Sequence, residues 1–248
     1  MKKFITNIFA RIWALWGLLS FAITFLIFFI PSICANFWKD PKSTRIFVMI
    51  SRWWMHVWLH LIGCPFEIKG RNHFKKNTAY IVTCNHNALL DIPLSSPFIP
   101  GPNKTIAKAS FAKVPLFGLY YKKGSVLVDR KSEKSRKESY LKMKQVLQTG
   151  MHMCIYPEGT RNKTKDLLRP FHGGAFRLAA DTGNSIIPGI ILNTKKAMPA
   201  HKFFYLLPQK LELHFLEPIP VLPGTTAQDL QKRTHEVMEA YLRNHQNI

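Results

Sequence analysis

Residues 79–91 read AYIVTCNHNALLD, and this stretch decides the fold class. Its apolar, β-branched first half predicts a strand over Ala79–Asn85. The polar loop that follows holds His86 and Asp91, five positions apart. Because functional groups in α/β proteins commonly follow the carboxyl ends of strands, the stretch predicts a site at one edge of a sheet.

Short apolar runs and helix-like segments alternate along the rest of the chain. Helices are predicted over Lys131–Leu147 and Gly174–Ala180, and Thr226 with Asp229 resembles a capping box that starts a last helix. This alternation favours an α/β fold with a central mixed sheet flanked by helices. The other predicted strands are Phe66–Lys69, Lys104–Ala107, Ser125–Val128, Met153–Tyr156, Ile186–Leu192 and Leu211–Leu216.

The N-terminal part has the composition of a membrane segment. The stretch Ile12–Ile30 is free of charge and long enough to cross a bilayer core as a helix, which Pro31 should end or kink. A second predicted helix, Thr44–Ile62, combines a broad apolar face with a narrow polar stripe. Such a helix suits the headgroup boundary, and an ordinary core helix is the alternative. The stripe consists of Arg45, Arg52, His56 and His60, and the helix also carries Trp53, Trp54 and Trp58.

Basic residues flank the apolar run on both sides, so their distribution does not fix its orientation. A helical hairpin that dips into one leaflet and a single span both fit. We expect a membrane-associated hairpin over 1–62 and an α/β domain over 63–248, attached to the inner (cytoplasmic) membrane with the catalytic domain facing the cytosol. The four cysteines form no C-x-x-C pair, which favours reduced thiols in the cytosol, and we expect no metal site.

The net charge is +21, from 35 Lys and Arg against 14 Asp and Glu. This excess predicts an anionic partner, such as an anionic membrane surface, an acidic carrier protein or nucleic acid. Seven basic residues lie within Lys122–Lys137, either as a docking patch or as a solvated helix face. That cluster lacks a nucleic-acid-binding motif with interleaved aromatics, so we expect no nucleic-acid partner. A serine hydrolase is disfavoured because no G-x-S-x-G elbow occurs.

The imidazole of His86 could accept a proton from a substrate hydroxyl while the carboxylate of Asp91 fixes its tautomer. Alone, the pair also fits a structural histidine beside a helix cap. Residues 156–161, YPEGTR, follow another predicted strand and add the carboxylate of Glu158 and the guanidinium of Arg161. Such a guanidinium suits phosphate, although a turn with a solvated ion pair is the alternative.

Four blocks, in order, resemble the glycerolipid acyltransferase family, and specifically 1-acylglycerol-3-phosphate acyltransferases of the bacterial type. The blocks are Asn85–Asp91, Gly124–Arg130, Tyr156–Arg161 and Ile187–Ile190, and Ala107–Gly118 is similar to a basic stretch of the family. The similarity covers about residues 65–220. Four positions depart from the family pattern, and they concern the acceptor more than the reaction. Ala88 and Asn162 stand where serine is common, Tyr156 replaces phenylalanine, and His172 stands where lysine is frequent.

The resemblance implies that His86 and Asp91 are catalytic and that Ile187 and Pro188 lie near an acyl pocket. It implies transfer from acyl-ACP (acyl carrier protein) or acyl-CoA to the sn-2 hydroxyl of 1-acylglycerol 3-phosphate, a membrane lipid, giving phosphatidate without a further cofactor. A different lyso-acceptor, such as a lyso-aminoacyl lipid or glycerol 3-phosphate, is the alternative. The implied substrate-binding residues are Lys108, Arg130, Glu158, Gly159, Thr160 and Arg161.

Overall fold

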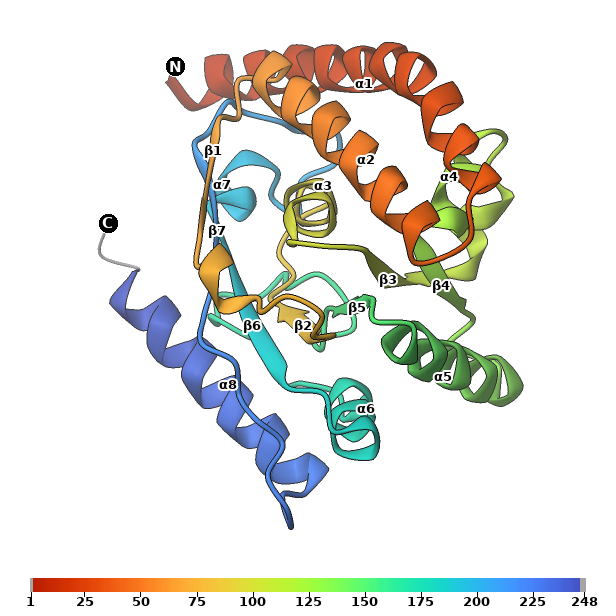
Figure 1. Ribbon diagram of the computed structural model, residues 1–248. Helices are drawn as coiled ribbons and strands as arrows, with labels where there is room; N and C mark the ends of the chain where they lie inside the picture. The colour runs from red at the N-terminus through yellow and green to blue at the C-terminus, as the bar shows by residue number, and fades with distance from the viewer. Residues whose placement is uncertain (1, 246–248) are drawn as a thin grey trace.

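The computed structural model describes residues 2–245, in which seven strands form one sheet in the order β1-β7-β6-β2-β5-β3-β4 (Figure 1). The strands run parallel within β2/β5, β2/β6, β3/β5, β3/β4 and β1/β7, whereas β6 and β7 are antiparallel. The predicted mixed sheet with flanking helices is therefore confirmed. The strands are β1 Phe66–Lys69, β2 Ile81–Cys84, β3 Asn103–Lys108, β4 Ser125–Val128, β5 His152–Ile155, β6 Ile186–Leu192 and β7 Leu211–Phe215.

The parallel pairing has a direct consequence for the site. Because β2, β5, β3 and β4 are successive parallel neighbours, their carboxyl ends meet at one edge of the sheet. The predicted strand over Ala79–Asn85 is shorter at both ends, and Asn85 ends it for a visible reason. Its side-chain amide donates to the carbonyl of Ile191 and accepts from the N–H of the same residue, at 2.9 and 2.7 Å.

Helices cover both faces of the sheet (Figure 1). Side chains alternate along each strand, so Val82 and Ile187 face the N-terminal helices while Ile81 and Ile186 face α5, α6 and α8. Beyond the two N-terminal helices, the α-helices are α3 Asp91–Ser95, α4 Phe117–Lys123, α5 Glu133–Gln148, α6 Gly174–Thr182, α7 Thr194–Ala197 and α8 Ala227–Asn244. The 3₁₀ helices are η1 Ala35–Phe37, η2 Arg71–His73, η3 Ser96–Phe98 and η4 Ala109–Lys113.

Two helices, α1 (Lys2–Cys34) and α2 (Lys42–Leu61), form an antiparallel pair above the sheet. The helix α1 continues through Pro31 to Cys34, so Pro31 does not end it. Indole N–H groups join the pair, since Trp54 donates to Thr24 at 2.9 Å and Trp58 donates to the carbonyl of Gly17 at 3.1 Å. Both tryptophans are buried in this contact, as the alternative of an ordinary core helix predicts, whereas Trp53 is 64% exposed.

The turn between the two helices is fastened to the sheet and to α4. The Asp40 carboxylate lies 3.1 Å from the ammonium of Lys104 on β3 and 3.8 Å from that of Lys123 on α4. Arg52 on α2 also donates to the carbonyls of Pro97 and Ile99, at 2.8 and 3.1 Å. Polar contacts from two elements thus hold the helix pair against the sheet.

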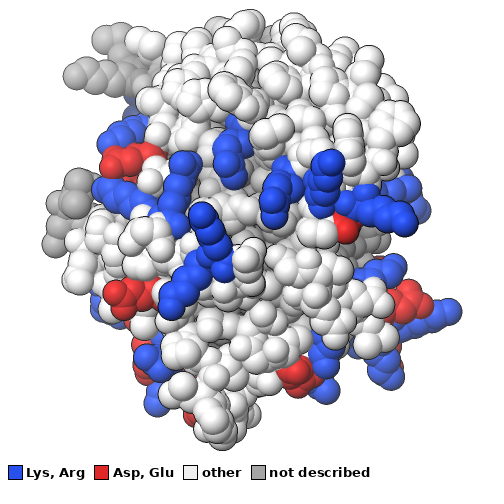
Figure 2. All heavy atoms as spheres, in the orientation of Figure 1, with Lys and Arg blue, Asp and Glu red and all other residues white. Residues whose placement is uncertain are grey.

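The outer face of α1 is strongly apolar. Within residues 2–245, one helix, over Lys3–Phe37, is long and apolar enough to cross a membrane. In Figure 2 the upper surface around α1 and α2 shows almost no charge, and a row of Lys and Arg side chains crosses the molecule below it. An apolar face of this extent marks a contact with lipid or with another protein. Its exposed members include Phe4, Ile8, Ile12, Leu19, Ile23, Leu26 and Ile30.

Candidate active site

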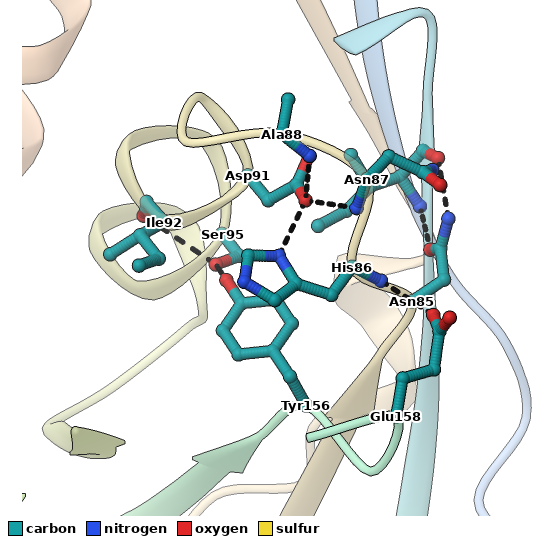
Figure 3. A network of polar contacts seen from close by, with 10 residues as sticks. Asn85, His86, Asn87, Ala88, Asp91, Ile92, Ser95, Tyr156 and Glu158 are labelled. Atoms are coloured by element: carbon teal, nitrogen blue, oxygen red, sulfur yellow. Dashed lines mark hydrogen bonds and ion pairs between the residues drawn. The ribbon is translucent and has the colours of Figure 1, made fainter. Parts of the chain in front are cut away.

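The first site group is the pair formed by His86, just after β2, and Asp91, the first residue of α3 (Figure 3). Nδ1 of His86 lies 2.8 Å from Oδ2 of Asp91, whose side chain is fully buried. Because the same oxygen also accepts from the N–H groups of Asn87 and Ala88, it acts as an acceptor and Nδ1 carries the hydrogen.

This arrangement determines what the other ring nitrogen of His86 can do. In the neutral imidazole, Nε2 is then the acceptor, and it has no hydrogen-bond partner among residues 2–245. The His86 side chain is 14% exposed, whereas that of Asp91 is 0% exposed. An accessible acceptor nitrogen backed by a buried carboxylate can take a proton from a hydroxyl group.

Glu158 connects the His86 loop to the loop that follows β5. Oε1 accepts from the N–H of His86 at 2.7 Å, and Oε2 accepts from the N–H of Arg169 at 3.0 Å. The residue is 1% exposed, and burial raises the pKa of its carboxyl, although both N–H groups favour the ionised form. The resemblance implies that Glu158 binds substrate; in the structure both of its oxygens accept from backbone amides, and its contact with substrate stays a prediction.

The backbone at position 159 has a conformation that few residue types other than glycine adopt. Its φ is +69°, and a Cβ there would lie 2.6 Å from Cδ2 of His172. The N–H of His172 donates to the carbonyl of Pro157 at 2.8 Å, which holds the ring in this place. The His172 ring thus fills the space that a side chain at position 159 would need.

Three cationic side chains are attached to this edge of the sheet. Lys108 ends β3, Arg130 follows β4, and Arg161 follows β5. Arg130 donates to the carbonyl of Gly159, and Lys108 is exposed. Arg161 makes no hydrogen bond or ion pair with any described residue, so its planar donor fork is available to an anion. Thr160 is exposed beside it.

The two residues expected near an acyl pocket lie in β6. Ile187 is fully buried on the sheet face that meets α1 and α2, and it shares that core with Trp54 and Val82. Pro188 pairs with Thr83 on β2, directly before the His86 loop. The sheet therefore brings both residues near the site, and their contact with an acyl chain stays a prediction.

Several residues that organise the site were not singled out for these contacts by sequence reasoning. Asn85 fastens β2 to β6, and the N–H of Asn162 donates to the carbonyl of His86 at 2.6 Å. Ser95 contacts the hydroxyl of Tyr156. The departure from the family pattern at Tyr156 was the available sequence signal for the contact between Ser95 and Tyr156. Nothing in the sequence around Ser95 points to this contact.

Comparison with known proteins identifies the family. A model of the family described as Acyltransferase matches residues 65–192, which is more than half of the chain. A 1-acyl-sn-glycerol-3-phosphate acyltransferase of Cocos nucifera is 36% identical over 145 residues, which cover 58% of this chain and 46% of that protein. An enzyme of the same name from Haemophilus influenzae is 26% identical over 205 residues, covering 81% of this chain and 82% of its own.

A solved structure extends the similarity to nearly the whole fold. The crystal structure of the 1-acyl-sn-glycerophosphate acyltransferase PlsC from Thermotoga maritima has a TM-score of 0.79 and 21% sequence identity. The match covers 98% of this chain and 97% of that chain, so the shared architecture includes the N-terminal helices. On these findings the chain belongs to the acyltransferase family and is an acyltransferase enzyme.

Proposed function

We propose that this enzyme transfers an acyl chain from a thioester to the sn-2 hydroxyl of 1-acylglycerol 3-phosphate, giving phosphatidate, with His86 as the general base. One observation carries the proposal: the bond from Nδ1 of His86 to buried Asp91 leaves Nε2 open at the cationic edge of the sheet. The acceptor follows from the names of the coconut and Haemophilus relatives.

The proposed proton transfers use the side chains of His86 and Asp91 and the two substrates. Nε2 of His86 takes the hydroxyl proton as the alcohol oxygen attacks the thioester carbonyl carbon. Asp91 stabilises the imidazolium that forms. The tetrahedral intermediate then collapses, the carbon–sulfur bond breaks, and the thiol leaves with the proton that His86 returns. No serine or cysteine nucleophile is required, because the acceptor supplies the attacking oxygen.

The cations at the sheet edge supply the positioning. Arg161 can present a bidentate fork to the phosphate of the acceptor, and Lys108 and Arg130 add charge from the neighbouring strands. Holding the acceptor hydroxyl against Nε2 converts a bimolecular encounter into an oriented one, which can lower the barrier by several kcal/mol. This arrangement favours a lyso-acceptor that carries a phosphate.

The N-terminal helix pair would keep the enzyme at the membrane that holds its acceptor. The outer face of α1 would be buried in the lipid, and the row of cations below it in Figure 2 would lie at the level of anionic headgroups. We infer a position on the cytoplasmic side of the inner membrane, where acyl-ACP or acyl-CoA would reach the site from solution. Liposome flotation with and without anionic lipid tests the attachment.

The decisive experiment is a product assay with the purified full chain in mixed micelles. A labelled acyl-ACP or acyl-CoA is offered with 1-acylglycerol 3-phosphate, glycerol 3-phosphate or a lyso-aminoacyl lipid. We expect labelled phosphatidate from the first acceptor and at least tenfold less product from the others. A preference for another acceptor would replace the proposed substrate and keep the reaction class.

The His86→Ala variant tests the base in the same assay. Turnover should fall at least about 10³-fold, because general-base catalysis is lost together with the polar partner of Asp91. The matched control is His235→Ala, which removes a histidine 3.7 Å from the Glu239 carboxylate on α8, far from the site in sequence. Normal turnover in His86→Ala would refute the mechanism.

A further inference from the structure

An aromatic ring lies against the face of the His86 imidazole (Figure 3). The ring of Tyr156, the first residue after β5, has its centroid 4.5 Å from that of His86 at an interplanar angle of 35°. The Tyr156 hydroxyl is 2.5 Å from Oγ of Ser95. Ser95 is fully buried and ends α3, the helix that begins with Asp91.

These contacts form a closed circuit around the imidazole. One path runs from His86 through the Nδ1 bond to Asp91 and along α3 to Ser95. The other runs from His86 across the ring contact to Tyr156, whose hydroxyl meets Ser95. Asp91 therefore fixes one edge of the imidazole, and Tyr156 limits rotation by covering one of its faces.

We propose that Tyr156, held by the Ser95 hydroxyl, is a positioning residue that keeps the His86 imidazole in its proton-accepting orientation. This inference rests on the proposed role of His86 as the base. It gives a role to the hydroxyl at position 156, where the family pattern has phenylalanine. A phenylalanine ring could cover the imidazole but could not bond Ser95, so the hydroxyl tie is a feature of this chain.

The chemistry of the two hydroxyl groups is consistent with this tie. Burial raises the pKa of the Tyr156 phenol well above its ordinary value, so the phenol stays protonated and can donate. Oγ of Ser95 lies 3.5 Å from the carbonyl of Ile92, which can take the serine hydrogen within the same helix. The direction Tyr156 to Ser95 to Ile92 gives each hydrogen an acceptor.

A set of three substitutions separates the ring from the hydroxyl. Tyr156→Leu removes both, and we expect kcat to fall about 100-fold, since a misplaced catalytic group can cost that factor. Tyr156→Phe keeps the ring and should recover most of this loss, leaving a deficit of about three- to tenfold. Ser95→Ala should show the same small deficit, and the double variant Tyr156→Phe/Ser95→Ala should be no worse than either single one.

The control is a second tyrosine that bonds through its hydroxyl. Tyr140 on α5 donates to the Asp181 carboxylate at 2.6 Å, on the sheet face away from α3. Tyr140→Phe and Tyr140→Leu should leave kcat within twofold of the wild type. KM for the acceptor should change less than twofold in every variant, because Tyr156 is not expected to bind it.

A measurement on the imidazole separates this inference from the proposed function. ¹⁵N NMR of histidine-labelled protein reports the tautomer of His86 without any substrate. We expect the Nδ1–H tautomer in the wild type and in Tyr156→Phe. In Tyr156→Leu we expect a mixture of tautomers, because the uncovered imidazole can rotate away from the Asp91 carboxylate that fixes its tautomer. A single tautomer in Tyr156→Leu, wild-type kcat in that variant, or multiplying defects in the double variant would each overturn the inference. If the wild-type enzyme were inactive on lysophosphatidate, the proposed function would be refuted. The tautomer of His86 would still decide whether Tyr156 positions the imidazole.

Discussion

Oδ2 of Asp91 accepts three hydrogen bonds, from Nδ1 of His86 at 2.8 Å and from the N–H groups of Asn87 and Ala88 at 2.5 and 2.8 Å. The two amides come from the loop between His86 and Asp91, so the loop turns its own backbone toward the carboxylate. The same contacts that close this loop also fix the tautomer of the histidine.

Asp91→Asn tests this dual use. The amide is close in size to the carboxylate, and its oxygen can still accept at the Oδ2 position because Oδ1 has no partner among residues 2–245. The neutral amide, however, no longer stabilises the imidazolium that forms during proton transfer. We expect kcat to fall by about 10³- to 10⁴-fold, as in other His–Asp pairs that lose the carboxylate. Steady-state kinetics and a thermal melt on the same sample check this. A proportionate loss of folded protein would point to a purely structural carboxylate.

Glu158→Gln addresses the tie between the two loops. One of the two backbone N–H groups, of His86 or Arg169, would lose its acceptor in a site that is 1% exposed. Leaving such a buried donor unpaired costs about 1–3 kcal/mol in the free energy of unfolding. We expect that loss in a denaturation curve, together with about a tenfold lower kcat from a displaced His86.

The acceptor KM separates the two roles considered for Glu158. It should stay within twofold of the wild type, because both carboxylate oxygens already accept from backbone N–H groups. Glu236→Gln, an exposed change on α8, serves as the control and should alter neither stability nor rate. A raised KM with normal stability would support the substrate-binding role that the family resemblance implies.

The contrast between Asp91 and Glu158 shows which contacts of the site can be predicted from the sequence. His86 and Asp91 are five residues apart, so a strand followed by a loop predicts their meeting directly. The capping box of Thr226 and Asp229 is local in the same way, and the structure confirms it. Short apolar runs bounded by turn residues likewise predict β1, β4 and β6 at their observed bounds.

Contacts between segments that are distant in the sequence could not be predicted from it. The N–H of His86 and its acceptor Glu158 are 72 residues apart, and Ser95 and Tyr156 are 61 apart. Which of these segments meet depends on the order β2-β5-β3, and no local pattern encodes strand order. The burial of Trp54 and Trp58 depends on α1 in the same way, because composition alone cannot distinguish a lipid contact from a helix contact.

Arg161→Gln tests the assignment of the phosphate site. The guanidinium has no partner among residues 2–245, so its removal should leave the melting temperature unchanged. A hydrogen bond to a charged group contributes about 1.5–3 kcal/mol, which predicts a KM for 1-acylglycerol 3-phosphate raised by about 10- to 150-fold. An uncharged alcohol acceptor should show no such change. Arg233→Gln on α8 is the control, and an equal KM in the two variants would remove Arg161 from the site.

His152 predicts a pH dependence of stability that is separate from catalysis. Its Nδ1 accepts from the N–H of Tyr80 at 3.0 Å, and its Nε2 donates to the carbonyl of Pro100 at 2.9 Å, so the folded protein holds the neutral ring. Burial lowers the pKa of His152 from 6.5 to about 4. Between these values the unfolded chain binds a proton that the folded chain does not, and stability must fall as the pH falls.

The size of this effect follows from the shift, which corresponds to about 3 kcal/mol lost between pH 7 and pH 4. Urea denaturation in detergent at several pH values measures it. In His152→Gln, an amide N–H can still reach Pro100 but cannot titrate, so the free energy of unfolding should depend less on pH over this interval. The exposed His201→Gln should keep the wild-type slope. If His152→Gln kept that slope as well, the acid sensitivity would belong to other groups, such as His214, whose pKa burial also lowers.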